Sequence, residues 1–129
     1  LFKTANKSNT IFFYNQAEKN KILGFKRKKI KIIKSKLNSK KKFDLKIILK
    51  KLYNIGIRNI LVEGGNELTK DFIDNKLFNI FYLYKSPKKL SKIEEFKEFN
   101  GFNILNRNYK NRNKINSNFG KDKITLYTR

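Results

Sequence analysis

The chain has 129 residues, and its 32 Lys and Arg against 10 Asp and Glu give a formal net charge of +22. It contains no Cys, which excludes disulfides and thiolate chemistry, and no His, which removes the commonest general base and metal ligand. A triad hydrolase and a zinc enzyme are therefore not expected, and we predict no metal site. The length fits a single domain with a core of its own.

The apolar runs and the N-terminal residues indicate the cellular location of the protein. No apolar run approaches the roughly 20 residues that span a bilayer. Residues 1–7 lack the apolar core and the cleavage site of a signal peptide. We therefore expect a soluble, cytoplasmic protein. Because the sequence opens on Leu1, we also expect it to be the C-terminal piece of a longer chain.

The excess of positive charge has two interpretations. One is a nucleic-acid-binding surface. The other is the amino-acid usage of an AT-rich coding sequence, since Lys, Asn, Ile and Phe are abundant while Pro occurs once and Trp never. The cations are nearly all Lys and occur along the whole chain, so we favour the compositional interpretation. A positive field would still help to gather an anionic substrate.

Two strands and two connections are predicted in the first third of the chain. Residues 10–14 are β-branched and aromatic, which predicts a strand, and the alternation in residues 29–34 predicts a second, half-exposed strand. The polar residues 18–28 predict a turn-rich connection. Residues 35–42 predict a loop in which the lysines at 40–42 are solvated and form no binding patch.

A helix is predicted after Asp44, which is a typical N-cap residue. Gly56 lies where a glycine closes a helix, and residues 57–62 predict a buried strand. The order of helix, glycine, strand, turn and helix is typical of an α/β fold with a largely parallel sheet. The helix rests on apolar side chains at helical spacing, namely Leu45, Ile48, Leu49, Leu52 and Ile55.

The next three predicted elements follow the same alternation. Residues 66–75 predict a second helix with Leu68 and Ile73 on its buried face. Residues 77–84 are nearly all apolar and predict a central buried strand. The charged residues 88–100 predict a short helix.

The end of the chain is predicted as strands and turns. Residues 102–105 predict a strand, and residues 106–118 predict a mobile or hairpin-like connection. A turn at residues 120–122 then leads into a final strand at residues 124–127.

The stretch Glu63-Gly64-Gly65 joins the predicted strand at 57–62 to the second helix. Two glycines allow positive φ and let a ligand approach the backbone closely, and N–H groups at a helix start attract anions. The same glycines also suit an ordinary turn. Glu63 favours a ligand site, because open α/β sheets bind ligands at the carboxyl ends of their strands. Pairing with a lysine is its alternative role.

The first turns of this helix supply further candidates. Asn66 suits either a cap or a phosphate donor, and Thr69 lies one turn inside. Lys70 would neutralise a phosphate, whereas Glu67 and Asp71 suit the helix dipole but oppose a phosphate that they face. We therefore expect these two carboxylates to point sideways.

Residues 44–87 resemble the reductase domain of the bifunctional riboflavin-biosynthesis deaminase–reductase. The similarity is carried by Gly56-Ile57, Leu61-Val62-Glu63-Gly64-Gly65-Asn66-Glu67-Leu68, Phe72-Ile73 and the apolar run that ends near Pro87. The closing Gly120-Lys121-Asp122 and Ile124-Thr125-Leu126-Tyr127 also resemble the family's terminal Gly-x-Asp and strand. Phe78-Asn79-Ile80 departs from the usual Val-Asp-Glu, and Leu90-Ser91 departs from the usual Leu-Gly.

The resemblance implies a dihydrofolate-reductase-like fold, a three-layer α/β/α sandwich with a mostly parallel central sheet. It implies an oxidoreductase that uses NADPH to reduce 5-amino-6-(5-phosphoribosylamino)uracil to the 5-phosphoribitylamino product. Glu63 would then contact the substrate, and no catalytic residue is assigned. The cofactor would be held by Gly64, Gly65, Asn66, Glu67, Leu68, Thr69, Lys70 and Asp71.

The resemblance also places the chain within a larger protein. We expect residues 1–129 to form one domain, the C-terminal portion of a reductase domain, without the N-terminal part of that domain and without a deaminase domain. A fragment of that kind can lack activity on its own. The expected partners are the phosphorylated pyrimidine and a second copy of the chain, with no membrane, and nucleic acid is not expected. The alternatives are a basic nucleic-acid-binding module and a reductase of the same fold that acts on another substrate.

Overall fold

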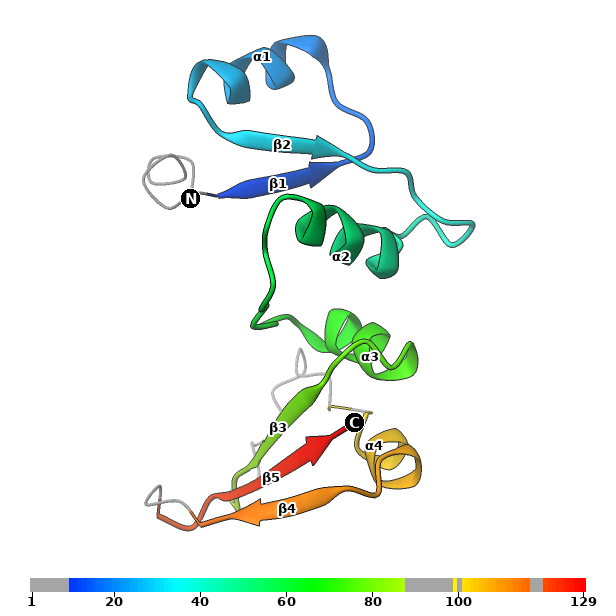
Figure 1. Ribbon diagram of the computed structural model, residues 1–129, viewed down its shortest axis with the longest axis vertical. Coiled ribbons are helices and arrows are strands. Elements are labelled where there is room, and N and C mark those ends of the chain that lie inside the picture. The colour runs from blue at the N-terminus through cyan, green and yellow to red at the C-terminus, as the bar shows by residue number, and fades with distance from the viewer. Residues whose placement is uncertain (1–9, 88–98, 100, 117–119) are drawn as a thin grey trace. The chain divides into compact units, whose positions relative to one another are not determined.

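The computed structural model describes residues 10–87, 99, 101–116 and 120–129. The chain divides into two compact units, Leu1–Asn59 and Ile60–Arg129, whose elements are labelled in Figure 1. Both units combine helices with a small sheet, so the predicted α/β class is confirmed. In these described ranges, no helix is long and apolar enough to cross a membrane.

The N-terminal unit is built on a parallel pair of strands. β1 (Ile11–Tyr14) and β2 (Lys31–Lys34) pair in parallel, with Phe12 opposite Ile32. The helix α1 (Lys19–Arg27) is the crossover between them (Figure 1), as a parallel pair requires. Both predicted strands are confirmed.

The prediction of a turn-rich connection at residues 18–28 is wrong, because α1 occupies it. Ile22 and Phe25 lie one turn apart, and the Phe25 ring packs against that of Phe12 on β1, with 5.2 Å between centroids. Gly24 suggested a turn, but a glycine inside a helix costs only about 1 kcal/mol. Packing of the apolar residues on the strand pair outweighs that cost.

The helix α2 (Leu45–Asn54) begins and ends as predicted. The Asp44 carboxylate accepts hydrogen bonds from two amides of the first turn, at 2.9 and 3.3 Å. Gly56 has a φ of +96°, and the amides of Gly56 and Ile57 donate to carbonyls of the last turn. This Schellman arrangement needs a left-handed residue, which glycine supplies without steric cost.

Ser35, directly after β2, is the one buried polar side chain among the described residues that lacks a hydrogen-bond partner there. Its backbone amide donates to the Tyr14 carbonyl at 2.8 Å, and the residue is 3% exposed. An unpaired buried hydroxyl costs about 1–3 kcal/mol. We therefore expect Ser35→Ala to raise the free energy of unfolding by about 1 kcal/mol in urea denaturation. The exposed Ser39→Ala should change nothing, and a destabilised Ser35→Ala would show that the hydroxyl is bonded.

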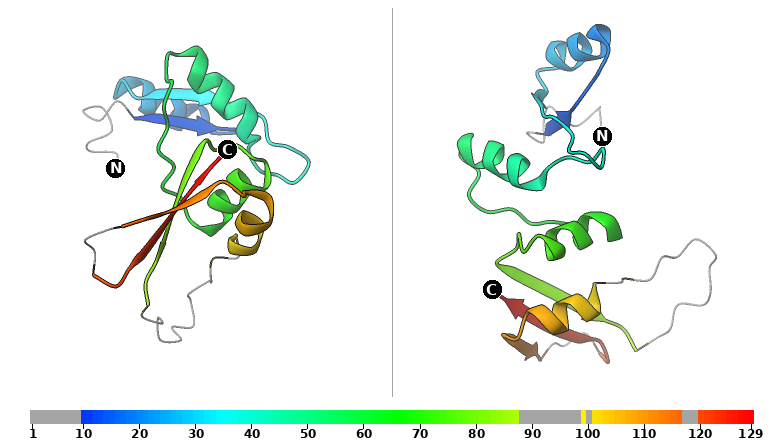
Figure 2. Two further views of the ribbon diagram at one scale, coloured as in Figure 1. Left: turned by 60° about the horizontal axis from the view of Figure 1, so that its bottom comes forward. Right: turned by 90° about the vertical axis from the view of Figure 1, so that its right-hand side faces the viewer.

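The C-terminal unit contains two helices and an antiparallel sheet of three strands. The strand order is β3, β5, β4, so the last strand of the chain lies in the middle (Figure 2). In chain order the elements are α3 (Asn66–Asp74), β3 (Ile80–Lys85), α4 (Phe102–Asn108), β4 (Arg112–Ile115) and β5 (Lys123–Thr128).

The core of this unit lies between the two helices and one face of the sheet. Ile73 of α3, Leu105 of α4, Tyr109 and Tyr127 of β5 form its buried cluster, and Phe81 of β3 packs against it. The Tyr109 hydroxyl donates to the Ile73 carbonyl at 3.1 Å. Burial raises the pKa of Tyr109 above its usual value, so this hydroxyl keeps its proton and its role as donor.

The predicted strand at residues 77–84 and the final strand both form, but their sheet differs from the expectation. The expectation of a mostly parallel sheet is wrong for this unit, where both pairings are antiparallel. Within the described sheet, β3 is an edge strand and is not buried on both faces. Its outward residues Ile80, Tyr82 and Tyr84 are 56%, 50% and 65% exposed, while Phe81 faces the core.

Of two further predictions near the C-terminus, one is wrong and the other is confirmed in part. Residues 102–105 form the start of α4 and no strand, because Leu105 packs in the core one turn before Tyr109. The hairpin-like alternative for residues 106–118 is confirmed in part, because this segment contains β4, which pairs antiparallel with the next strand, β5. The turn at 120–122 is confirmed, with a φ of +62° at Gly120. The helix predicted at 88–100 falls mostly outside the described residues.

The buried strand predicted at residues 57–62 does not form. This segment is irregular, and Leu61 is 83% exposed. None of the strands in the described ranges pairs with it. A strand is stable only when a neighbour accepts and donates its backbone hydrogen bonds, so an apolar run without a neighbour stays extended and irregular.

Candidate functional site

The candidate site is the turn that leads into α3. Gly65 is the N-cap, with φ −66° and ψ 174°, and Asn66 is the first helical residue. Asn66 is therefore not the cap. The expectation of positive φ at this turn is also wrong, because the described glycines with positive φ are Gly56 and Gly120.

The two glycines of the turn have different surroundings. A Cβ added to Gly64 would lie 2.6 Å from Leu68 Cδ2 and 3.0 Å from Leu68 Cβ, whereas one added to Gly65 would meet nothing within 4 Å. Packing of Leu68 therefore explains the glycine at Gly64. Neither backbone conformation nor packing against described residues explains the glycine at Gly65, which leaves room for a ligand to approach its backbone.

The close approach of Leu68 to Gly64 predicts a stability effect. Gly64→Ala should lower the free energy of unfolding by about 1–3 kcal/mol, the usual cost of overpacking, while Gly65→Ala should cost less than about 1 kcal/mol as a weaker N-cap. Urea denaturation of the two variants tests this difference. Combining Gly64→Ala with Leu68→Ala should recover part of the loss, and equal losses for the two single variants would contradict the packing.

Thr69 holds the turn in place. Its hydroxyl donates to the Gly64 carbonyl at 3.3 Å, and its amide donates to the Gly65 carbonyl at 3.1 Å. Since the carbonyl and the amide of one trans peptide point in opposite directions, the Gly65 N–H points away from Thr69. No described residue accepts a hydrogen bond from this amide. The sequence did not show this use of the Thr69 hydroxyl.

The charges around the turn are mostly negative in an otherwise basic chain. Between residues 63 and 74 there are four carboxylates and one cation, Lys70. Lys70 pairs with Asp74 one turn further along α3, so its charge is directed away from the helix start. A phosphate at this site would therefore be bound by backbone amides and by the positive end of the helix dipole.

The predicted site residues lie on one continuous segment. Glu63, Gly64, Gly65, Glu67 and Lys70 are exposed. Leu68 is 38% exposed and packs on the turn, and Asn66, Thr69 and Asp71 are half-buried. The described residues contain no group of three or more carboxylate, His or Cys side chains placed to hold a metal ion.

A family comparison bears directly on this turn. The family described as RibD C-terminal domain matches residues 1–115, which include both the glycine turn and α3. The chain belongs to the RibD C-terminal domain family. No curated protein matches it. The matched range ends at the last residue of β4, so the similarity noted for residues 120–127 lies outside it.

Membership in the RibD C-terminal domain family supports a reductase function of the riboflavin-biosynthesis type. It agrees with the resemblance carried by residues 44–87.

Proposed function

We propose that this protein takes part in the NADPH-dependent reduction of 5-amino-6-(5-phosphoribosylamino)uracil to its 5-phosphoribitylamino product. The observation that carries the proposal is the match to the RibD C-terminal domain across the glycine turn and α3. We further propose that the complete domain has the dihydrofolate-reductase-like sandwich, works in the cytoplasm and pairs with a second copy.

The reaction changes one carbon of the sugar. C1′ gains a hydride, the bond between C1′ and the ring oxygen O4′ breaks, and O4′ gains a proton, so that the ring becomes an open ribityl chain. NADPH, when bound, supplies the hydride and leaves as NADP⁺. The protein's part is to bind and orient the two molecules, which is chemistry that a chain without His or Cys can perform.

The cofactor is proposed to bind at Gly64, Gly65 and the following residues through Asp71. The open space at the Gly65 Cβ position and the outward Gly65 amide fit a phosphate of NADPH. The Thr69 hydroxyl bonds back to Gly64 and the Lys70 amine bonds to Asp74 within α3, so we assign Thr69 to support of the turn and Lys70 to support of the helix. Backbone amides would contact the phosphate.

Glu63 is proposed to bind the substrate. Its carboxylate is exposed directly before the turn, and a carboxylate accepts hydrogen bonds from the hydroxyl and N–H groups that a ribosylaminouracil presents. The negative charge of Glu63 would repel the substrate phosphate, so we place the uracil or the sugar hydroxyls beside it.

The test compares Glu63→Gln with Glu18→Gln in NADPH oxidation driven by the phosphoribosylamino substrate. Loss of a charged hydrogen bond of about 1.5–3 kcal/mol should lower kcat/KM by about 10- to 100-fold in Glu63→Gln and leave NADPH affinity unchanged. Glu18→Gln removes an exposed carboxylate outside the proposed site, so it serves as the matched control and should behave like the wild type. Equal activity of all three proteins would remove Glu63 from the substrate site.

A further inference from the structure

The positive charge of the protein is concentrated in its N-terminal unit. Residues 1–59 contain 18 Lys and Arg against only Glu18 and Asp44, whereas residues 60–129 contain 14 Lys and Arg against eight acidic residues. Cations do occur along the whole chain, but the scarcity of acidic residues makes the N-terminal unit the more basic one. A reductase site at the start of α3 would lie in the less basic unit.

The lysines at 40–42 lie at the tip of an ordered hairpin. Leu37 and Phe43 form an isolated antiparallel bridge at its base. The tip between them carries Lys40, Lys41 and Lys42, all exposed. Lys41 has a left-handed φ of 57°, a backbone conformation that residues with a side chain seldom adopt. This region was predicted as a solvated loop, and the solvent exposure is confirmed, but the backbone is built into a defined turn.

Asn38 organises this tip. Its side-chain oxygen accepts hydrogen bonds from the amides of Lys40 at 2.9 Å and Lys42 at 3.0 Å. Its backbone amide donates to the Lys42 carbonyl at 2.7 Å, and its carbonyl accepts from the Lys41 amide at 3.0 Å. These four hydrogen bonds of Asn38 fix the backbone that carries the adjacent lysines. The loop is therefore already ordered before a partner binds, which lowers the entropic cost of binding.

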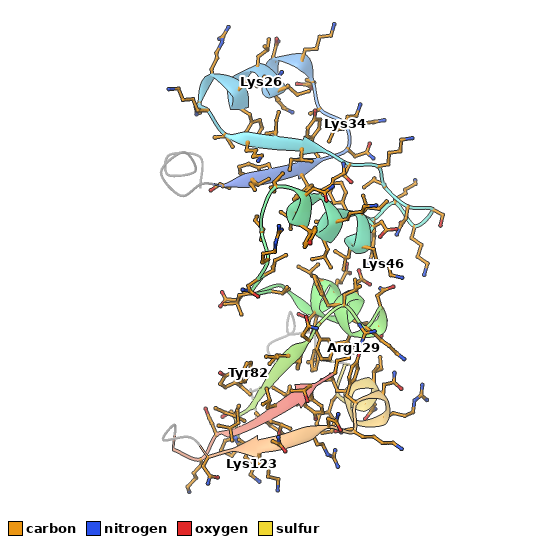
Figure 3. The ribbon with its side chains drawn as sticks, in the orientation of Figure 1. Lys26, Lys34, Lys46, Tyr82, Lys123 and Arg129 are labelled. Atoms are coloured by element: carbon orange, nitrogen blue, oxygen red, sulfur yellow. The ribbon has the colours of Figure 1, made fainter. Side chains whose placement is uncertain are left out.

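More cations flank the hairpin on both sides. Lys34 ends β2 and Lys46 lies in the first turn of α2, and both are exposed. Figure 3 labels these two side chains on the elements before and after the hairpin. Lys36 adds an exposed cation at the hairpin base. We call this group, with the hairpin tip, the lysine hairpin surface.

We propose that the lysine hairpin surface binds the phosphate backbone of double-stranded nucleic acid without reading its bases. A duplex carries one negative charge per about 1.7 Å, which matches closely spaced lysines. Single strands are usually bound on exposed aromatic rings. The aromatic residue at the hairpin base, Phe43, is half-buried, and the exposed Tyr53 has the Arg58 guanidinium over its ring.

The experiment measures binding of a fluorescently labelled short DNA duplex to the full chain by anisotropy, without NADPH, over a series of salt concentrations. Lys40→Gln/Lys41→Gln should weaken binding at least tenfold at about 0.1 M salt and lower the salt slope by about two. The matched control, Lys121→Gln/Lys123→Gln, removes two exposed lysines in the other unit, one in the turn before β5 and one at the first residue of β5. It should change the affinity by less than about threefold.

Asn38→Ala tests the contribution of the hairpin's hydrogen-bonded backbone apart from that of its positive charge. It keeps every lysine, so the salt slope should stay that of the wild type while the affinity falls several-fold, because the loop must be ordered on binding. Circular dichroism would confirm that each variant is folded. Equal weakening by the two lysine pairs, tighter binding of the single strand, or stronger binding to vesicles of anionic lipid would each overturn the proposal. Since NADPH is absent, these outcomes do not depend on the proposed reductase function.

Discussion

Gly65→Asp is expected to fold as the wild type does and to lose NADPH binding. Aspartate is a favourable N-cap residue, and the backbone at Gly65 has a φ of −66° that any residue adopts, with open space at the Cβ position. The new carboxylate would lie where the cofactor phosphate is proposed to bind. A pair of like charges at about 4 Å repels by about 4 kcal/mol near a protein surface, so the affinity should fall at least about 100-fold.

The matched control for this variant is Gly65→Asn, which has nearly the same shape without the charge. Asparagine is also a good N-cap residue, so both variants should have at least the thermal stability of the wild type. NADPH should raise the melting temperature of the wild type, raise that of Gly65→Asn by less, and leave Gly65→Asp unchanged. If NADPH stabilised the Asp and Asn variants equally, no cofactor phosphate would lie at this turn.

Ile73→Ala should have the largest effect on stability. Ile73 is fully buried in the cluster with Leu105, Tyr109 and Tyr127, and its carbonyl accepts a hydrogen bond from the Tyr109 hydroxyl. Truncation of such an isoleucine costs about 2–5 kcal/mol through lost burial and the cavity left behind. The free energy of unfolding of a domain of this size is only about 5–15 kcal/mol in total. The helix α3, which follows the glycine turn, should therefore become less stable when its core is truncated.

Urea denaturation followed by circular dichroism measures this loss. Ile80→Ala is the control, because Ile80 lies in the same unit with its side chain 56% exposed, and it should cost less than about 1 kcal/mol. Similar losses for the two variants would mean that the buried cluster is not the core of this unit.

The local signals in the sequence predicted both ends of α2 correctly. Asp44 and Gly56 act through neighbours within one turn, so a single residue type at the right place determines the cap. The strands β1, β2 and β5 were also predicted, since β-branched and aromatic runs between polar residues are strong signals. The helix α1 was not predicted, because Gly24 indicates a turn and the spacing of Ile22 and Phe25 is only a weak signal for a helix.

Properties that depend on distant partners were predicted poorly. The apolar runs at 57–62 and 77–84 look alike in sequence, yet the second pairs with β5 and the first pairs with no strand in the described ranges. An apolar run does not specify its neighbours, and it does not specify whether they run parallel or antiparallel. The mostly parallel sheet was therefore wrong for the C-terminal unit.

The candidate site was proposed from the sequence, but the contacts within it needed the structure. The motif Glu63-Gly64-Gly65 marked the turn before α3. It did not show that Leu68 occupies the space beside Gly64, that Gly65 is open, or that Thr69 bonds back to the turn. These contacts join residues four and five positions apart, where side-chain direction decides the outcome.

Amide nuclear magnetic resonance of the isotope-labelled chain during titration with NADPH tests the central claim most directly. If the turn and the start of α3 bind the cofactor through backbone amides, the largest shifts will fall on Gly65 and the residues that follow it as far as Asp71. The amides of the lysine hairpin surface should shift less. Saturable binding with the amides of Gly64 to Asp71 unmoved would contradict the cofactor site proposed at the glycine turn.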